Sequence, residues 1–193
     1  MADRDSKLIL TDRPHGFFTD LLRSSISRQR AKINESTTTY LVDLMVGFLD
    51  QTDLTERPLA FLLQDALAES GAMRAAKLRH LGDTSLFVSG FFPEWLDRRV
   101  VGTSYYISMG SRAYQALSTA RQASIFLELS TRFQQLVELL NEVHEQTLLN
   151  TEAGTVALYE RVLQTGSMRT ASLMKSKGLE APTPIFPTRG RSN

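Results

Sequence analysis

Apolar residues recur every three or four positions along most of the chain, which is the spacing of one face of an α-helix. The pattern is clearest from Ala123 to Val143, where it predicts one long amphipathic helix. No stretch shows the sustained alternation of a β-strand, and no unit repeats along the chain. The sequence therefore predicts an all-α protein. Further helices are expected near 17–30, 37–51, 58–70, 73–81, 104–120, 151–164 and 168–177.

These segments predict a single-domain helical bundle of about seven helices over residues 15–177, a size that one domain can bury. Residues 1–14 are expected to form a loose N-terminal arm that ends at Pro14. Residues 178–193 lack helical periodicity, so we expect an extended or disordered Pro-rich tail whose Ile185–Phe186 pair is available for clipping onto the body or a partner. The prolines of this tail are Pro182, Pro184 and Pro187.

One predicted helix is apolar on nearly every side. Between Tyr40 and Leu49 a broad apolar stripe is joined by Val42 and Val46 on the other face. A helix of this kind is either buried or lies at an interface. Together with the apolar pair in the tail, it favours a protein that binds another protein or forms a homo-oligomer.

The stretch from Leu78 to Tyr114 mixes bulky apolar residues with polar side chains that need partners when buried. We predict either a polar contact that joins helices or a small-ligand pocket in which tyrosine hydroxyls and an arginine hold an anionic or carbonyl-bearing molecule. The candidate ligand-binding residues are His80, Asp83, Tyr105, Tyr106, Arg112 and Tyr114.

Two details of this stretch leave alternatives open. Gly82 either ends one helix, with Asp83 capping the next, or lies within a continuous helix at a close approach to a neighbour. Arg112 needs a carboxylate if it is buried, and Asp83 or Glu128 is the natural candidate.

Composition narrows the class of protein. Hydrophobic residues make up 42% of the chain and charged residues 22%, and the net charge is +1, as in ordinary soluble proteins. The chain contains no cysteine, which excludes disulfides and thiolate sites. The N-terminus carries no signal peptide and no segment is long enough to span a membrane, so a cytoplasmic protein without membrane contact is expected. The basic cluster from Arg23 to Lys32 is predicted to be a solvated helix face rather than a nucleic-acid contact.

Catalytic and metal-binding patterns are missing from the sequence. His80 and Asp83 share a helix face but lack the second Glu-x-x-His motif of a di-iron bundle. His80 and His144 are predicted to be core residues rather than haem ligands. Neither a nucleophile elbow nor a phosphate-binding glycine loop occurs. We therefore predict a non-enzymatic protein with no cofactor and no metal.

The segments LGDTSLFVSGFF and YYISMGSRAY resemble the core of an uncharacterised bacterial helical protein family. The resemblance covers about Tyr40 to Leu173 and implies an all-helical fold. It implies no activity, cofactor or catalytic residue. The leading hypothesis is thus protein–protein interaction or self-association, and the alternative is a ligand-binding or enzymatic bundle with a pocket around Asp83, Tyr105, Tyr106 and Arg112.

Overall fold

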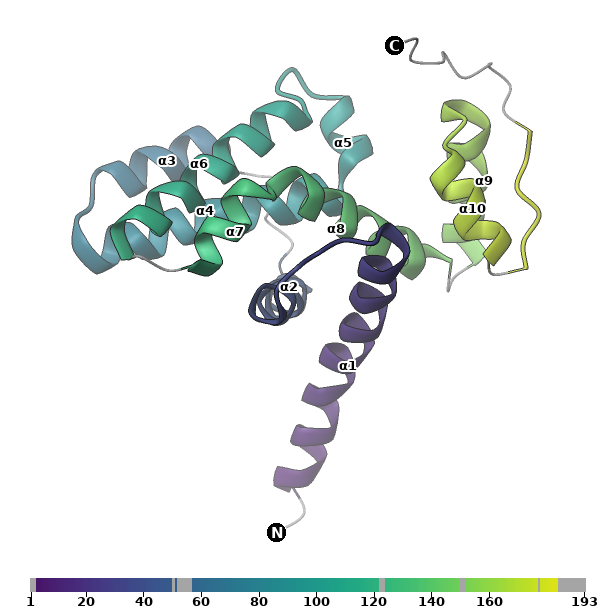
Figure 1. Ribbon diagram of the computed structural model, residues 1–193, viewed down its shortest axis with the longest axis horizontal. Helices are drawn as coiled ribbons and strands as arrows, with labels where there is room; N and C mark the ends of the chain where they lie inside the picture. The colour runs from purple at the N-terminus through teal and green to yellow at the C-terminus, as the bar shows by residue number, and fades with distance from the viewer. Residues whose placement is uncertain are drawn as a thin grey trace. The chain divides into compact units, whose positions relative to one another are not determined.

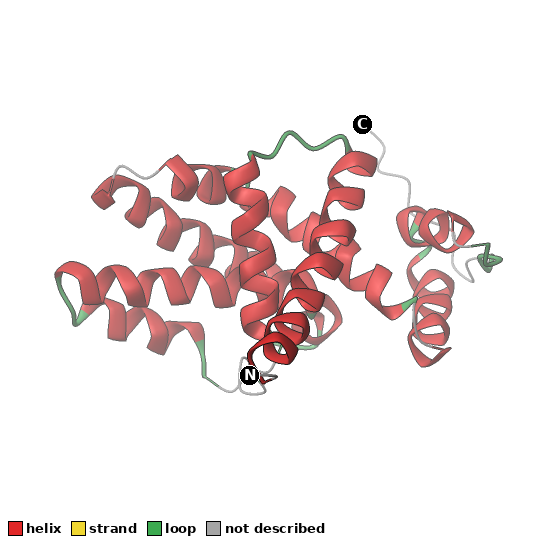
Figure 2. Cartoon of the chain, turned by 90° about the horizontal axis from the view of Figure 1, so that it is seen from below, coloured by secondary structure: helices red, strands yellow, loops and turns green. Residues whose placement is uncertain are grey.

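A computed structural model describes residues 3–49, 51, 57–121, 124–149, 152–176 and 178–183. All regular structure in these ranges is helical, without a strand (Figure 2), which confirms the all-α prediction. The ten helices of this described part are α1 (Asp3–Gln29), α2 (Glu35–Phe48), α3 (Leu59–Leu67), α4 (Gly71–Phe91), α5 (Pro93–Asp97), α6 (Thr103–Arg121), α7 (Ser124–Thr131), α8 (Phe133–Leu148), α9 (Glu152–Thr165) and α10 (Met168–Ser176) (Figure 1).

The chain divides into two compact units, residues 1–141 and residues 142–193, and α8 runs across the division. The single domain predicted over residues 15–177 is corrected accordingly. The physical reason is that α9 and α10 have a small apolar core of their own. It consists of Leu158, Val162 and Met174, with Leu148, Leu149, Ala171 and Leu179 packed against it.

Helices α4 and α6 form the centre of the first unit and lie side by side, with α3 against α4 and α7 against α6 (Figure 1). Small residues allow this close approach, because a Cβ atom at Gly110 would lie 2.6 Å from the Cβ of Ser85. The rings of Phe48, Phe87 and Phe91 stack at centroid distances of 4.8 Å and 4.5 Å. Aromatic stacking thereby ties α2 to α4 inside the core.

The apolar helix predicted around Tyr40–Leu49 corresponds to α2, which begins at Glu35 after an Asn34 N-cap, slightly earlier than the predicted start. Both its apolar stripe and much of its second face are buried, and α2 packs against α1, α4 and α7 of its own unit. Burial within the unit therefore explains most of the apolar character of this helix. Leu49, the C-cap residue of α2, is an exposed apolar side chain.

Helix α4 is continuous from Gly71 to Phe91, so the second interpretation of Gly82 is the correct one. A Cβ atom at Gly82 would lie 2.5 Å from Cε1 of Tyr114. The glycine is thus required because the Tyr114 ring of α6 rests directly on the α4 backbone.

Two further helix predictions need correction. The long helix predicted from Ala123 to Val143 is divided into α7 and α8 at Arg132. Helical hydrogen bonds are retained on both sides of this residue: its amide donates to Glu128 O (3.0 Å) and its carbonyl accepts from the Leu136 amide (2.9 Å). The division is therefore a local distortion that apolar spacing does not reveal, and it raises the helix count.

The residues assigned to a loose N-terminal arm, 1–14, lie largely within α1, which begins at Asp3 and continues through Pro14. Proline removes one backbone hydrogen bond from a helix and bends it, but it does not have to end the helix. In the predicted tail, residues 178–183 form no helix. Ile185 and Phe186 lie outside the described residues.

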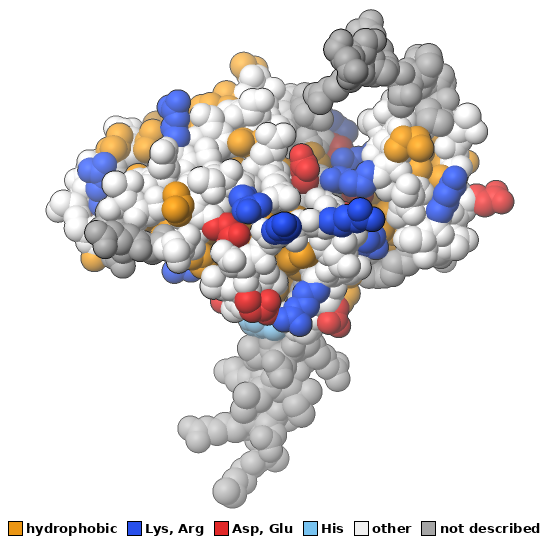
Figure 3. Space-filling model, in the orientation of Figure 1, with side chains coloured by type: hydrophobic (Ala, Val, Ile, Leu, Met, Phe, Trp, Pro, Cys, Tyr) orange, Lys and Arg blue, Asp and Glu red, His pale blue; other side chains and the backbone are white. Residues whose placement is uncertain are grey.

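Charged side chains of both signs are interspersed on the face shown in Figure 3, with hydrophobic side chains scattered between them. This distribution agrees with the net charge of +1. Among the described helices, none combines the length and the apolar character that crossing a bilayer requires.

Candidate functional site

The largely buried carboxylate of Asp83, 17% exposed, lies at the centre of a polar cluster in the first unit. The hydroxyl of Tyr114 on α6 donates a hydrogen bond to Asp83 Oδ1 at 2.7 Å. The hydroxyl of Tyr40 on α2 donates to the same oxygen at 2.5 Å. Three helices that are distant in sequence are thus joined at one carboxylate oxygen. Hydrogen bonds to an ionised acceptor are stronger than those between neutral groups.

Arg79 completes this cluster from α4, one helical turn before Asp83. Its Nε–H donates to the Tyr40 hydroxyl oxygen at 3.0 Å and lies 3.6 Å from Asp83 Oδ2. The guanidinium also lies 4.9 Å from the centre of the Tyr40 ring, in a cation–π arrangement. Both contacts with oxygen are made by Nε. Within the described residues the two terminal nitrogens have no hydrogen bond.

The electrostatics of the cluster follow from burial. Removal from water raises the pKa of Asp83 above its ordinary range, and the hydrogen bonds from Tyr40 and Tyr114 and the charges of Arg79 and His80 offset part of this rise. Burial, followed by the negative charge of Asp83, also raises the pKa of Tyr114 and of Tyr40. Both phenols therefore remain protonated at neutral pH and act as hydrogen-bond donors.

A cavity of about 270 Å³ adjoins the cluster, and Arg79 forms part of its wall. Arg79 is the charged member of a lining that is otherwise apolar. Two of the other lining residues connect the cavity to the cluster, because Phe126 stacks on Tyr114 with a centroid distance of 6.0 Å and Leu117 lies one turn after Tyr114 on α6. The complete lining is Ala72, Ala75, Ala76, Arg79, Leu117 and Phe126.

The structure brings together two of the six predicted ligand-binding residues, Asp83 and Tyr114. His80 and Arg112 are exposed, and neither forms part of the cavity wall. Tyr106 is buried and its ring meets that of Trp95 edge-on at 6.5 Å, while Tyr105 is half-buried beside it. These two tyrosines therefore belong to the packing near α5 rather than to the Asp83 cluster.

The carboxylates expected for Arg112 have other partners. Asp83 is paired with Arg79, and Glu128 lies 3.6 Å from Arg132. Glu128 also accepts a hydrogen bond from the Thr37 hydroxyl at 2.5 Å. The physical reason is helical spacing, because Arg79–Asp83 and Glu128–Arg132 are each four positions apart in backbone with helical hydrogen bonds.

Sequence reasoning missed Tyr40, Arg79 and Phe126. The spacing of Arg79 and Asp83 was a usable signal, since an arginine four residues before an aspartate is a standard helical ion pair. Tyr40 was hidden because it lies in a strongly apolar stripe, where its ring is expected and its hydroxyl is easily overlooked. Phe126 was overlooked for a similar reason, because it belongs to an apolar helical stripe and was taken for a core residue.

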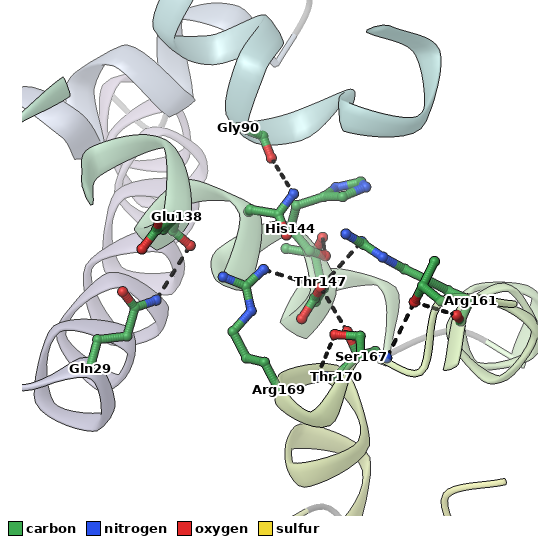
Figure 4. Close-up of polar contacts among 12 residues, drawn as sticks. Gln29, Gly90, Glu138, His144, Thr147, Arg161, Ser167, Arg169 and Thr170 are labelled. Carbon is green, nitrogen blue, oxygen red and sulfur yellow. Dashed lines mark hydrogen bonds and ion pairs between the residues drawn. The ribbon is translucent and has the colours of Figure 1, made fainter. Parts of the chain in front are cut away.

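The second unit contains a different buried carboxylate, Glu145 on α8, which sequence analysis did not single out. Its side chain is fully buried, and Oε1 lies 3.2 Å from Arg161 and 3.4 Å from Arg169. The Thr170 hydroxyl donates to the same oxygen at 3.0 Å. Figure 4 shows the side chains of Arg161, Arg169 and Thr170 converging. This cluster ties α9 and α10 to the end of α8.

No group of three or more metal-ligating side chains is gathered at one point in the described part of the chain. Comparisons of this chain with protein-family models, curated proteins and solved structures found no match. The inference about function therefore rests on the geometry of the residues themselves.

Proposed function

We propose that the first unit binds a small organic anion with an apolar body, in the cavity beside the Asp83 cluster. The observation that carries the proposal is the position of Arg79 in an otherwise apolar cavity wall. This replaces the predicted pocket around Tyr105 and Arg112 with one formed by α4, α6 and α7. It retains Asp83 and the anionic class of ligand from the alternative sequence hypothesis.

The lining supports this ligand class. Three alanines, a leucine and a phenylalanine offer an apolar surface, and binding sites for small molecules usually combine such a surface with few polar groups. A volume of about 270 Å³ lies just below the usual range for ligand pockets, which begins at about 300 Å³. The cavity therefore suits a compact molecule of one or two rings.

The setting of Arg79 also supports anion binding. Its Nε is held by Tyr40, and its guanidinium lies over the Tyr40 ring, so that the side chain is oriented before a ligand arrives. Guanidinium groups bind carboxylate, sulfonate and phosphate oxygens through paired N–H donors. The terminal nitrogens of Arg79 supply such donors.

The cluster supports binding rather than catalysis. The raised pKa of Tyr114 keeps its phenol protonated, which makes it a poor nucleophile and a poor general base at neutral pH. Its hydroxyl is also committed to Asp83. The roles left to these residues are orientation of Arg79 and support of the cavity wall.

Calorimetric titration with naphthalene sulfonate tests the proposal, with naphthalene methanol as the uncharged counterpart of the same shape. We expect the sulfonate to bind more tightly, and Arg79→Gln to weaken sulfonate binding by roughly tenfold, the effect of losing one charge-assisted contact. Arg112→Gln is the matched control, because it removes an exposed arginine from α6. Equal binding of the two probes, or equal loss in both variants, would contradict the proposal.

A second candidate function is self-association, the leading hypothesis from the sequence. It is favoured by the exposure of Phe61 and Leu67 on α3 and of Met73 at the start of α4, which are 52%, 56% and 56% exposed. Sedimentation velocity over a range of concentrations, with Phe61→Asp as the disrupting variant, tests it. A monomer at every concentration would contradict this candidate.

A further inference from the structure

The connection between α5 and α6 exposes apolar residues to an unusual degree. We name residues 98–101, Arg98-Arg99-Val100-Val101, the valine loop. Val100 is fully exposed and Val101 is 46% exposed. Phe92, immediately before α5, is 38% exposed. Figure 1 shows this connection extending beyond the adjacent ends of α5 and α6. Adjacent aliphatic side chains at the tip of a loop are costly in water unless they meet an apolar surface.

Positive charge accompanies the exposed valines. Arg98 and Arg99 are both exposed, and they follow directly on the acidic residue Asp97 that ends α5, with Glu94 one turn earlier. The guanidinium of Arg99 lies 4.4 Å from the centre of the Trp95 ring, which holds this charge beside the loop. A cationic pair next to an apolar tip complements an anionic surface with an apolar interior.

Aromatic residues flank the loop on both sides. Trp95 and Tyr105 are half-buried, and the Trp95 ring is fixed by its edge-on contact with Tyr106. Tryptophan and tyrosine are enriched at the level of lipid headgroups, where one end of the ring is apolar and the other is hydrated. In the sequence the aliphatic pair is thus bordered by arginines and by aromatic residues, the residue types that favour the headgroup level of a bilayer.

We propose that the valine loop is a membrane-contact element that inserts Val100 and Val101 into an anionic lipid surface, with Arg98 and Arg99 among the headgroups. A projecting tip fits a lipid surface, which deforms around it, whereas a protein partner needs a matching groove. This differs from the absence of membrane contact expected from the net charge and the lack of a spanning segment. The net charge of the whole chain does not reveal that two arginines are adjacent at positions 98 and 99.

The proposal is independent of the anion-binding cavity. The valine loop precedes the first residue of α6, whereas Leu117 of the cavity lies near the other end of that helix. At the rise of an α-helix these positions are about 20 Å apart. Failure of one proposal therefore leaves the other untouched.

Trp95 provides a direct reporter, because it is the single tryptophan of the chain. The full-length protein is mixed with vesicles of phosphatidylcholine alone and with equimolar phosphatidylcholine and phosphatidylglycerol, and binding is measured by flotation and by tryptophan fluorescence. We expect binding and a blue shift with the anionic vesicles only. High salt is expected to weaken binding, because it screens the arginines.

Substitutions in the loop separate its two contributions. The double variant Val100→Asp/Val101→Asp is expected to lower partitioning by tenfold or more, roughly the effect of burying one or two valines. Arg98→Gln is expected to lower it by roughly fivefold, the effect of one basic residue near an anionic surface. Val156→Asp is the matched control, because Val156 on α9 is also exposed, at 58%.

Three results would overturn the proposal. The first is an absence of binding to anionic vesicles at low salt. The second is binding that survives the double valine substitution or is lost equally in Val156→Asp. The third is a dimer, detected by sedimentation velocity, that the loop variant dissociates while vesicle binding is unchanged. That last result would assign the loop to a protein interface.

Discussion

Asp83 and Glu145 are carboxylates removed largely (17% exposed) and completely (0%) from water, and their surroundings differ. Asp83 accepts hydrogen bonds from two tyrosine hydroxyls and is paired with Arg79 at the edge of the cluster. Glu145 is fully buried between two arginines and a threonine hydroxyl. The first is stabilised mainly by neutral donors and the second mainly by opposite charge.

This difference separates two uses of a buried charge. The arginines around Glu145 come from α9 and α10, and both are directed to one oxygen of the carboxylate, so the cluster acts as a junction between helices. At Asp83 the tyrosines supply the junction. Arg79 therefore keeps free terminal donors in the cavity wall, which is why we propose this cluster, and not that of Glu145, as the ligand site.

The largest expected effect is that of Glu145→Ala. Removing one partner of a buried ion pair typically costs about 3–5 kcal/mol, because the remaining charges stay poorly solvated. We expect a loss near the lower limit, since the Arg169 side chain is 37% exposed. Denaturant titration measures the loss, and hydrogen exchange should show it concentrated in α9 and α10. A change below about 1 kcal/mol would mean that the charges are solvated.

Tyr114→Phe tests the neutral donors at Asp83. The substitution removes a buried hydroxyl that donates to a carboxylate, and we expect a loss of about 2 kcal/mol in the free energy of unfolding. Tyr159→Phe is a suitable control, because that tyrosine is 44% exposed on α9. If Tyr114→Phe is as stable as the control, the hydrogen bond to Asp83 does not hold the cluster together.

Gly82→Ala tests the close contact between the Tyr114 ring and the α4 backbone at Gly82. The added methyl group would lie 2.5 Å from the ring, and overpacking of this kind costs about 1–3 kcal/mol. Alanine recovers about 1 kcal/mol of helix propensity, so a small net loss is expected. Gly47→Ala in α2 is the matched control, because no atom lies within 4 Å of its added methyl and this variant should gain stability. A gain in stability in both variants would show that the Tyr114 ring does not need a glycine at position 82.

The smallest effect concerns pH. A carboxyl whose pKa is raised by folding stabilises the fold most below its ordinary pKa, and this contribution is lost as pH rises through the raised value. Asp83→Asn lacks the titrating group. The melting temperature of the wild-type protein, measured relative to that of the variant, should therefore fall as the pH rises from acidic to neutral. Parallel profiles would show that the pKa of Asp83 is unperturbed.

Periodic apolar spacing predicted most of the fold, because helices bury one stripe each. It located the segments that became α2, α6, α9 and α10. It missed the division at Arg132 and the helical course through Pro14, since both depend on backbone geometry and not on the pattern of burial. It also missed the separate unit of α9 and α10, which is defined by tertiary contacts alone.

The candidate site was predicted only in part. Asp83 was found because a charge in an apolar segment requires partners. A carboxylate partner was expected for Arg112 only if that arginine is buried, and Arg112 is exposed. The meeting of Tyr40 and Tyr114, from two other helices, at Asp83 depends on tertiary packing. A single sequence does not contain this information in readable form.

The most direct test of the central claim is the affinity for naphthalene sulfonate of wild-type protein and Asp83→Asn, measured by calorimetry across acidic to neutral pH. The probe stays charged throughout, whereas Asp83 competes with it for Arg79 only when ionised. We predict tighter binding to Asp83→Asn at neutral pH, and wild-type affinity that rises to meet it as the pH falls. Equal, pH-independent affinities would contradict the assignment of Arg79 as the anion-binding group.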